Sequence, residues 1–398
     1  MIKKELISIL KNCLPVGSSE AFSLHEPNFS KTEENNVLEC IRTGWVSYQG
    51  KFVSEFEEKL AKFCDAKHAV VVSSGTVALF ITLKALGIEE KDEVLVPSLT
   101  FIATANAVHH IGAIAHFVEV SKESLGIDSD KLDQYLANIG EFNNGKLINK
   151  NTGRTIKAII PVHIFGHPVD MDKLVKVAKK YSLIIIEDGA ESLGSKYKNQ
   201  QVGAFGEAGI LSFNGNKIIT TGGGGAIITN SDDLAKDIKH LTTTAKKVHP
   251  YEFVHDQIGY NFRMPNLNAA LGVAQLDRIN YFLEKKRALA MLYIEAFKNS
   301  DSFEFVKEPS YAMSNYWLNA ITISKPEQDN KDDLIQALHS EKIYARPLWR
   351  PLHMLEIYRS NPRCSDLSIT EDLYNKIICL PSSAFLYDLK KEDMHSNK

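Results

Sequence analysis

The sequence predicts an α/β protein whose large, mostly parallel mixed sheet carries helices on both faces, followed by a smaller C-terminal α+β domain. Short, fully apolar strands alternate with stretches of helical spacing along the first two thirds of the chain, which is typical of such sheets. With 398 residues, of which 44% are hydrophobic, the chain can bury one large core and a second, smaller one.

The first strand, Ala69–Val72, runs into Ser73-Ser74-Gly75-Thr76. A helix is expected over Val77–Leu86, with Gly87 as its C-cap. The later strands are expected at Glu93–Val96, Ile114–Val120, Ile156–Val162, Leu183–Ile186, Ile210–Phe213 and Ala226–Thr229. Asn143–Arg154 is rich in Asn, Gly and Lys and is predicted to be an exposed loop.

The pattern changes after Pro265. Leu267–Lys298 is predicted to be a long helical stretch, broken once, that leads into strands near Trp317–Ile323 and Ile343–Ala345. We therefore expect an N-terminal extension over residues 1–24, a large domain over 25–280 and a small domain over 281–398.

The composition narrows the class of protein. The charges of 46 basic residues nearly cancel those of 49 acidic ones. The chain therefore has no strong positive electrostatic field to attract polyanions, and nucleic-acid binding is a minor alternative. Five scattered cysteines without C-x-x-C spacing indicate reduced thiols rather than a disulfide framework or a metal site. No apolar run reaches the roughly 20 residues of a membrane span, and Leu6–Leu10 is too short for a signal peptide. A soluble, cytoplasmic protein is expected.

The apolar strand Leu183–Ile186 continues directly into Glu187 and Asp188. Ligands of parallel sheets bind outside the carboxyl ends of the strands, so Asp188 is expected to face a ligand crevice. A carboxylate there would keep a pyridine nitrogen protonated, and the ring would then accept electrons. The alternative is a helix N-cap, because Gly189-Ala190-Glu191 has the composition of a helix start.

Lys217 follows Ser212-Phe213-Asn214-Gly215-Asn216 and precedes four glycines, Gly222–Gly225. A lysine taken out of water beside a cationic ring has a lowered pKa and can form a Schiff base. The glycines would let the backbone approach a ring or a neighbouring subunit. Taken alone, the lysine is ordinarily a solvated surface charge and the glycines are ordinarily a flexible turn. The occurrence of both features between apolar strands favours a reactive amine.

The turn Ser73-Ser74-Gly75-Thr76 is a candidate phosphate site, since backbone N–H groups at a helix start bind anions. Many strand–helix turns look like this, so the signal is weak by itself. The G-x-G-x-x-G fingerprint is absent here, which argues against a nicotinamide dehydrogenase.

These three motifs, in this order, resemble the DegT/DnrJ/EryC1/StrS family, whose members are fold-type-I pyridoxal-phosphate aminotransferases that act on nucleotide-linked keto-sugars. The resemblance runs from about His25 to about Ser383. Further stretches that carry it are Thr43–Ser47, Val96–Asn106, Pro161–Gly166 and Gly259–Pro265. Together with Leu24–Ser30, the pair Glu191-Ser192 favours the subgroup that makes legionaminic acid, bacillosamine and perosamine precursors.

The resemblance implies roles for single residues. Lys217 is the amine that binds pyridoxal 5′-phosphate and shuttles a proton, and Asp188 is the acid that pairs with the ring nitrogen. The remaining cofactor contacts are Phe101 on the ring face and Gly75, Thr76 and Ser212 at the phosphate. Asn261 is expected to reach the phosphate of the partner's cofactor, which implies a homodimer with shared sites. Arg263 is a weaker candidate for substrate binding, with a structural salt bridge as the alternative.

Two features depart from the common pattern. Many members place Gln or His three residues after the acid, beside the phenolic oxygen of the cofactor, where this chain has Glu191. A carboxylate there must be protonated or share a proton with that oxygen. Relatives also end in a full helix, whereas Ala384–Lys398 is short and weakly amphipathic, so that this helix is expected to be reduced or missing.

The implied reaction moves an amino group from L-glutamate to a 4-keto(-6-deoxy) sugar on UDP or GDP, for surface-polysaccharide or glycan precursors. One alternative is a deoxygenase or dehydratase on the same scaffold, although relatives that dehydrate replace the lysine with histidine. Another is a sensor that binds ligand without catalysis. Lys246–Gln257 and Pro347–Tyr358 are expected to select the sugar.

Overall fold

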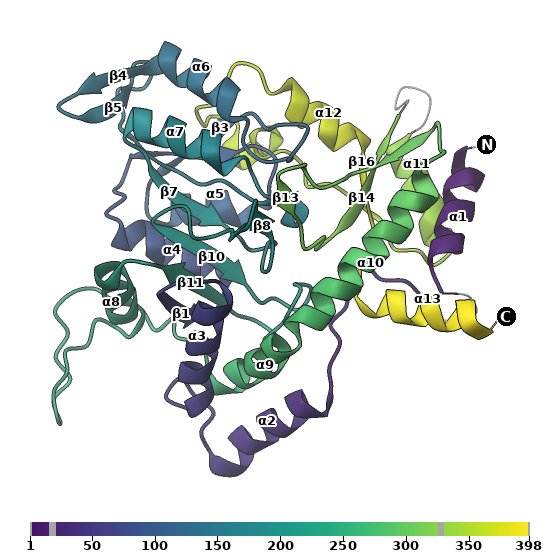
Figure 1. The fold of residues 1–398 in the computed structure, drawn as a ribbon. Helices are drawn as coiled ribbons and strands as arrows, with labels where there is room; N and C mark the ends of the chain where they lie inside the picture. The colour runs from purple at the N-terminus through teal and green to yellow at the C-terminus, as the bar shows by residue number, and fades with distance from the viewer. Residues whose placement is uncertain (1, 16–20, 325–329, 397–398) are drawn as a thin grey trace.

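The computed structural model describes residues 2–15, 21–324 and 330–396, and its centre is a seven-stranded sheet (Figure 1). The strand order is β1-β11-β10-β7-β6-β2-β3. Strands β10, β7, β6, β2 and β3 run parallel, while β11 is antiparallel to both β1 and β10. Their bounds are β1 His68–Val72, β2 Glu93–Pro97, β3 Ile114–Val118, β6 Ile156–Ile159, β7 Ile184–Asp188, β10 Ala208–Ser212 and β11 Gly225–Thr229. The predicted mixed, mostly parallel sheet is confirmed.

Helices cover both faces of this sheet (Figure 1). Alternate residues of β1 show why its sequence is apolar throughout: Val70 and Val72 belong to one buried cluster, whereas Ala69 and Val71 belong to another. A strand that is buried on both faces has no polar side in its two-residue repeat. The helices of this part are α2 Lys31–Thr43, α3 Lys51–Phe63, α4 Gly75–Ala85, α5 Ala103–His110, α6 Ser129–Ile139, α7 Met171–Tyr181, α8 Asp232–Thr242 and α9 Asn266–Asp277, with the 3-10 turn η1 Ile164–Gly166.

The predicted loop at Asn143–Arg154 is wrong in its first half. Strands β4 Gly140–Asn143 and β5 Lys146–Asn149 form an antiparallel hairpin. Asn144 and Gly145 close it with positive φ angles of 49° and 76°, the backbone of a two-residue hairpin turn. Asn149 is buried and its Nδ2 donates to Glu93 Oε2 at 2.8 Å. The Asn-Gly pair is therefore a turn signal inside a segment whose composition suggests a loop.

The C-terminal part is built on a four-stranded antiparallel sheet of order β12-β14-β16-β15. The predicted break in the long helical stretch is confirmed, because α9 ends at Asp277 and α10 begins at Ile279. The strand expected at Ile343–Ala345 lies just before β15, and Ile343 forms a bridge with Phe22. The bounds here are β12 Phe303–Phe305, β14 Asn319–Ile323, β15 Arg346–Pro347, β16 Ile377–Leu380, α10 Ile279–Phe297, α11 Lys331–Ser340 and α12 Ser368–Lys376, with η2 Leu352–Met354 and η3 Glu356–Tyr358. A three-stranded sheet, β8 Lys196–Tyr197, β9 Gln200–Gln201 and β13 Ala312–Met313, joins the two parts.

Both ends of the chain lie against the C-terminal part (Figure 1). Helix α1 (Ile2–Cys13) buries Leu6 and Leu10 in the cluster that also contains Leu386 of α13 (Phe385–Ser396). The expectation that the last helix is missing is wrong, because its apolar first turn anchors it in this core. Tyr281 Oη also donates to Asp388 at 2.5 Å. The division into domains after residues 24 and 280 remains a prediction.

The described residues bear on three further expectations. All five cysteines are free and buried. The described part of the chain holds no group of His, Cys, Asp and Glu side chains arranged for a metal ion. Among the described helices, none combines the length and the apolar composition that a membrane crossing requires.

Candidate active site

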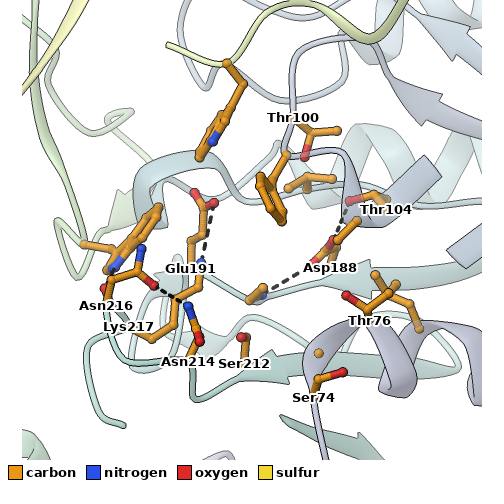
Figure 2. Close-up of a pocket in the computed structure, with 18 of the residues that line it drawn as sticks. Ser74, Thr76, Thr100, Thr104, Asp188, Glu191, Ser212, Asn214, Asn216 and Lys217 are labelled. Atoms are coloured by element: carbon orange, nitrogen blue, oxygen red, sulfur yellow. Dashed lines mark hydrogen bonds and ion pairs between the residues drawn. The ribbon is translucent and has the colours of Figure 1, made fainter. Parts of the chain in front are cut away.

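A cavity of about 370 Å³ opens where β7 and β10 end, beside the start of α4 (Figure 2). Its walls come from both parts of the molecule, because Trp317, Arg346 and Trp349 of the C-terminal part line it together with the large sheet. The expected site residues that line it are Gly75, Thr76, Phe101, Asp188, Glu191, Ser212 and Lys217. The structure thus brings together seven residues that the sequence spreads over more than 140 positions.

One end of the cavity has the features of a phosphate site. Ser74 is the N-cap of α4 and its Oγ accepts from Val77 N at 3.1 Å. Gly75 and Thr76 line the cavity, and as first-turn residues their amides have no acceptor within the helix. A Cβ on Gly75 would lie 3.1 Å from Ser212 Cβ, and one on Gly225 would lie 2.5 Å from the Ser74 carbonyl carbon. Glycine at these two positions lets the helix start approach β10 and β11 this closely.

Asp188 occupies the carboxyl end of β7, deep in the cavity. Thr104 Oγ1 donates to its Oδ2 at 2.7 Å and Ala190 N donates to its Oδ1 at 3.2 Å. Burial raises the pKa of Asp188, while the Thr104 hydrogen bond and the charge of Lys217 act in the opposite direction. No helix follows it, so the alternative of a helix N-cap is not realised. A buried carboxylate of this kind is stabilised by a protonated ring nitrogen.

Phe101 lies in the segment between β2 and α5 and is 52% exposed, whereas Thr100 before it is buried. The centroid of its ring lies 6.4 Å from that of Trp349 across the cavity. An aromatic side chain whose face is open to a cavity suits a planar ring as ligand.

Lys217 reaches into the cavity from the turn after β10, and its side chain is only 13% exposed. Its Nζ lies 3.8 Å from Glu191 Oε1 and 3.9 Å from the centroid of the Trp317 ring. Burial lowers the pKa of Lys217, while Glu191 and then Asp188 act to raise it. A lowered pKa increases the fraction of neutral amine, the form that bonds to carbonyl carbons.

Glu191 lies opposite Lys217 and is also buried. Phe165 N donates to its Oε2 at 2.8 Å. Burial raises the pKa of Glu191 to about 7, against the opposing influence of Lys217 and of the Phe165 amide. A pKa in this range is compatible with a carboxyl that is protonated or shares a proton, and the expected place of Glu191 beside the phenolic oxygen of the cofactor stays a prediction.

Asn261 and Arg263 lie outside the cavity. Arg263 Nη2 forms a 2.7 Å ion pair with Glu57 Oε1, and Asn261 is exposed and forms a bridge with Thr243. Their expected ligand contacts stay predictions, and that of Asn261 concerns a partner subunit.

Five residues that line the cavity have no role assigned from the sequence: Thr104, Asn214, Asn216, Trp317 and Arg346. Trp349, which also lines it, belongs to Pro347–Tyr358, one of the segments expected to select the sugar. Thr104 lies in the motif Val96–Asn106, and Asn214 and Asn216 lie in Ser212–Lys217. Their position beside predicted site residues was a signal that they also line the site. Trp317 and Arg346 come from the C-terminal part, where the sequence carries no comparable motif.

Comparison with known proteins identifies the family. Residues 27–395 match the DegT/DnrJ/EryC1/StrS aminotransferase family. The chain belongs to this family. The aminotransferase is 38% identical to GDP-perosamine synthase of Escherichia coli O157:H7 over 360 residues. This match covers 90% of this chain and 92% of the synthase. It is 35% identical to EpsN of Bacillus subtilis (strain 168), whose provisional name is a pyridoxal phosphate-dependent aminotransferase, over 91% of this chain and 90% of EpsN.

The fold of the aminotransferase agrees with solved structures of relatives. Helicobacter pylori PseC, described as an aminotransferase of pseudoaminic acid biosynthesis, superimposes with a TM-score of 0.84. The match has 27% identity and covers 95% of this chain and all of PseC. The expected cofactor is confirmed: the aminotransferase uses pyridoxal 5′-phosphate, and the helix start, the buried acid and the reactive lysine of the cavity fit that molecule.

Proposed function

We propose that this aminotransferase moves an amino group from L-glutamate to a 4-keto(-6-deoxy) sugar carried on GDP or UDP, in the synthesis of surface-polysaccharide or glycan precursors. The observation that carries the proposal is the largely buried amine of Lys217, which shares one cavity with Asp188 and the start of α4. The 38% identity to a GDP-perosamine synthase supports a nucleotide-linked sugar as the acceptor.

The cavity residues divide the cofactor contacts among themselves. Asp188 would pair with the ring nitrogen, Phe101 would cover the ring, and Gly75, Thr76 and Ser212 would hold the phosphate. When bound, the cofactor supplies an aldehyde carbon that bonds to amines and a ring that accepts electrons.

Lys217 acts as the proton carrier in the proposed reaction. In its neutral form it would take a proton from the amino-bearing carbon of the donor and deliver it to the carbon on the other side of the amino nitrogen, which comes from the cofactor's aldehyde. With the acceptor sugar it would move a proton in the reverse direction. Such placed proton transfers contribute about 10²–10⁴-fold to the rate. Relatives that dehydrate sugars have histidine at this position, so the presence of Lys217 favours transamination over that alternative.

Arg346 supports glutamate as the donor. Its side chain lines the cavity and forms no ion pair with the described residues. Two carboxyl groups, Asp188 and Glu191, line the same cavity. A donor with two carboxylates therefore needs a fixed positive charge, and a guanidinium suits a carboxylate by geometry as well as by charge.

A homodimer with shared sites is part of the proposal. The segment after α8 extends away from the rest of the molecule (Figure 1) and exposes Val248, Tyr251, Phe253 and Ile258, each at least 77% exposed. Apolar side chains in such a row favour contact with another protein surface. Asn261, at the base of this segment, is not among the residues that line the cavity of its own chain, and we propose that it serves the partner's cofactor.

The dimer can be tested by complementation. Chains with Lys217→Ala and chains with Asn261→Ala are unfolded or dissociated together and reassociated. If the sites are shared, each mixed dimer has one intact site and the mixture regains activity that neither variant has. A mixture that stays as inactive as its components would contradict shared sites.

The substrate is tested with a panel of 4-keto-6-deoxy sugars on GDP and UDP, each incubated with glutamate and analysed by the mass of the product. Amination replaces the keto oxygen with an amino group and consumes one glutamate for each sugar. Loss of oxygen without consumption of glutamate would identify the deoxygenase alternative, and tight binding of every sugar without product would identify a sensor. Reactions with Lys217→Ala or without glutamate are the controls.

A further inference from the structure

The amine of Lys217 lies close to two groups that attract it only while it is charged, and Figure 2 labels the first of them, Glu191. On one side is the Glu191 carboxyl, with Oε1 3.8 Å from Nζ. On the other is the face of the Trp317 ring, with its centroid 3.9 Å from Nζ. A carboxylate attracts an ammonium by charge and an indole attracts it through the negative face of its ring. Neither force acts on a neutral amine to a comparable extent.

Trp317 is fixed in place by contacts of its own. Its ring Nε1 donates to the carbonyl of Asn216, the residue before Lys217, at 2.7 Å. Its backbone carbonyl accepts from Lys286 Nζ at 3.0 Å, and its ring stacks on Trp349 with an interplanar angle of 8°. The indole face is therefore tied to the segment that carries the lysine.

Glu191 is fixed as firmly. Phe165 N donates to the carboxyl at 2.8 Å, from a backbone with φ of 57°, in the left-handed region that non-glycine residues seldom adopt. Asn315 Nδ2 donates to the backbone carbonyl of Glu191 at 2.8 Å. The residue with the strained backbone, Phe165, is also the one that donates a hydrogen bond to the Glu191 carboxyl. Such strain is typical of functional sites, which favours a functional role for the position of this carboxyl.

We infer that Glu191 and Trp317 form a charge-dependent resting site for the free amine of Lys217, which they hold while it is protonated and release when it is neutral. The separation of 3.8 Å supports release, because it is longer than a hydrogen bond and leaves the amine free to turn. The other charged or titratable groups near the amine are Asp188 and Arg346 in the cavity wall and His25 behind it. In this role Glu191 and Trp317 are positioning residues.

The resting site matters for catalysis if Lys217 is the working amine, and in that respect it rests on the proposed function. A lysine displaced by the amino donor would be held beside the reacting carbon as an ammonium. Once it loses its proton, both attractions vanish and the neutral amine can act on the reacting carbon. The protonation state of Lys217 would thus also decide its position.

The experiment uses the cofactor-free protein, so it is independent of any substrate. Lys217 is labelled with trace acetic anhydride across a pH series, and the extent of labelling is read from the mass of its peptide. The midpoint of the curve gives the pKa of Lys217, while the plateau gives its accessibility. Wild type is compared with Glu191→Gln, which keeps an acceptor for the Phe165 amide, and with Trp317→Phe and Trp317→Leu.

We expect the pKa midpoint of Lys217 to fall by about one unit or more in Glu191→Gln, which raises labelling roughly tenfold at a fixed pH below the midpoint. Trp317→Leu should lower the midpoint by a smaller amount, about a twofold to fivefold change in labelling, and Trp317→Phe by less. The matched control is Glu39→Gln, which removes the same charge from an exposed ion pair with Lys51. It should leave Lys217 unchanged.

An unchanged midpoint in Glu191→Gln, or a midpoint that rises in Trp317→Leu, would overturn the inference. The proposed function would survive either result, because amination of a sugar does not enter the measurement. Circular dichroism spectra of each variant check the fold. If Trp317→Leu does not fold, the Phe variant still tests the contribution of the indole.

Discussion

Two lysines of this aminotransferase are largely withdrawn from water, and they differ in what surrounds their amines. Burial lowers the pKa of both Lys217 and Lys286. Lys286 Nζ donates to the carbonyls of Trp317 at 3.0 Å and Ser382 at 2.6 Å, and its side chain is fully enclosed. Lys217 forms no hydrogen bond through Nζ with the described residues, and it faces a cavity.

The comparison separates two requirements for the proposed reactive lysine: withdrawal from water, which both lysines have, and open space in front of the amine, which Lys217 alone of the two has. The amine of Lys286 donates hydrogen bonds to two backbone carbonyls and is enclosed, which leaves no space for a ligand. These bonds connect α10 to the segments next to β14 and β16. Lys217 has a carboxyl and an indole face that hold its charge, and space in front of its amine. We therefore expect a reactive lysine to keep its amine free of fixed hydrogen bonds and open to a ligand. Substitution of either lysine tests this difference.

The largest effect is expected from Lys217→Ala. Without the amine, turnover should fall by at least about 10³-fold, since a proton transfer and the bond to the cofactor are lost together. The visible absorption band of the lysine-bound cofactor should disappear as well. Steady-state rates and an absorption spectrum measure both, and wild-type turnover in this variant would refute the assignment of Lys217.

Asp188→Asn should have the next largest effect. The substitution keeps the shape and the Thr104 contact but removes the charge that would face the ring nitrogen. Loss of one partner of a buried ion pair costs about 3–5 kcal/mol, or roughly 10²–10⁴-fold. The drop is measured as turnover at saturating cofactor. Thr104→Val, which removes only the supporting hydrogen bond, is the milder control.

Lys286→Met tests the structural side of the comparison. The variant nearly preserves the side-chain volume but leaves two buried carbonyls without a donor, at a cost of about 2–4 kcal/mol in the free energy of unfolding. Urea unfolding should show that loss while the visible cofactor band remains. A variant as stable as wild type would mean that these hydrogen bonds contribute nothing net.

The smallest effect concerns the pH dependence of stability through Glu191. Its folded-state pKa is about 7, above the usual 4.5, so the folded protein holds the proton more tightly between these values. Stability from this group is therefore present below pH 4.5 and lost as pH rises to 7. Glu191→Gln should abolish that loss, which amounts to at most about 3 kcal/mol.

The measurement is the difference in melting temperature between Glu191→Gln and wild type, both without cofactor, from pH 5 to pH 8. The difference should grow in favour of the variant as pH rises. A difference that shrinks over this range would mean that the carboxyl is stabilised as an anion.

The large sheet, and the wall of the cavity that this sheet and its loops provide, could be predicted from the sequence. Strands buried on both faces are fully apolar, Asp188 is the last residue of β7, and Lys217 lies in the turn that follows β10, so that local patterns were sufficient. The turn at Gly75 and Thr76 could be recognised for the same reason.

The remaining features depend on contacts between distant segments. Trp317 and Arg346 reach the cavity only because the C-terminal sheet packs against the large one. Lys286 follows Lys285 in a helix rich in charged residues, and nothing in that pattern reveals that one is enclosed while the other pairs with Asp388. The last helix was missed because its anchoring depends on a core built from α1 and α10, far away in the sequence.

The most direct test of the central claim is to identify the lysine that bonds to the cofactor. The protein loaded with pyridoxal phosphate is reduced with sodium borohydride, digested and analysed by peptide mass spectrometry. We expect the mass of the reduced cofactor on Lys217 and on no other residue, with Lys286 unmodified. Modification of Lys286 or of any other lysine in place of Lys217 would contradict the account.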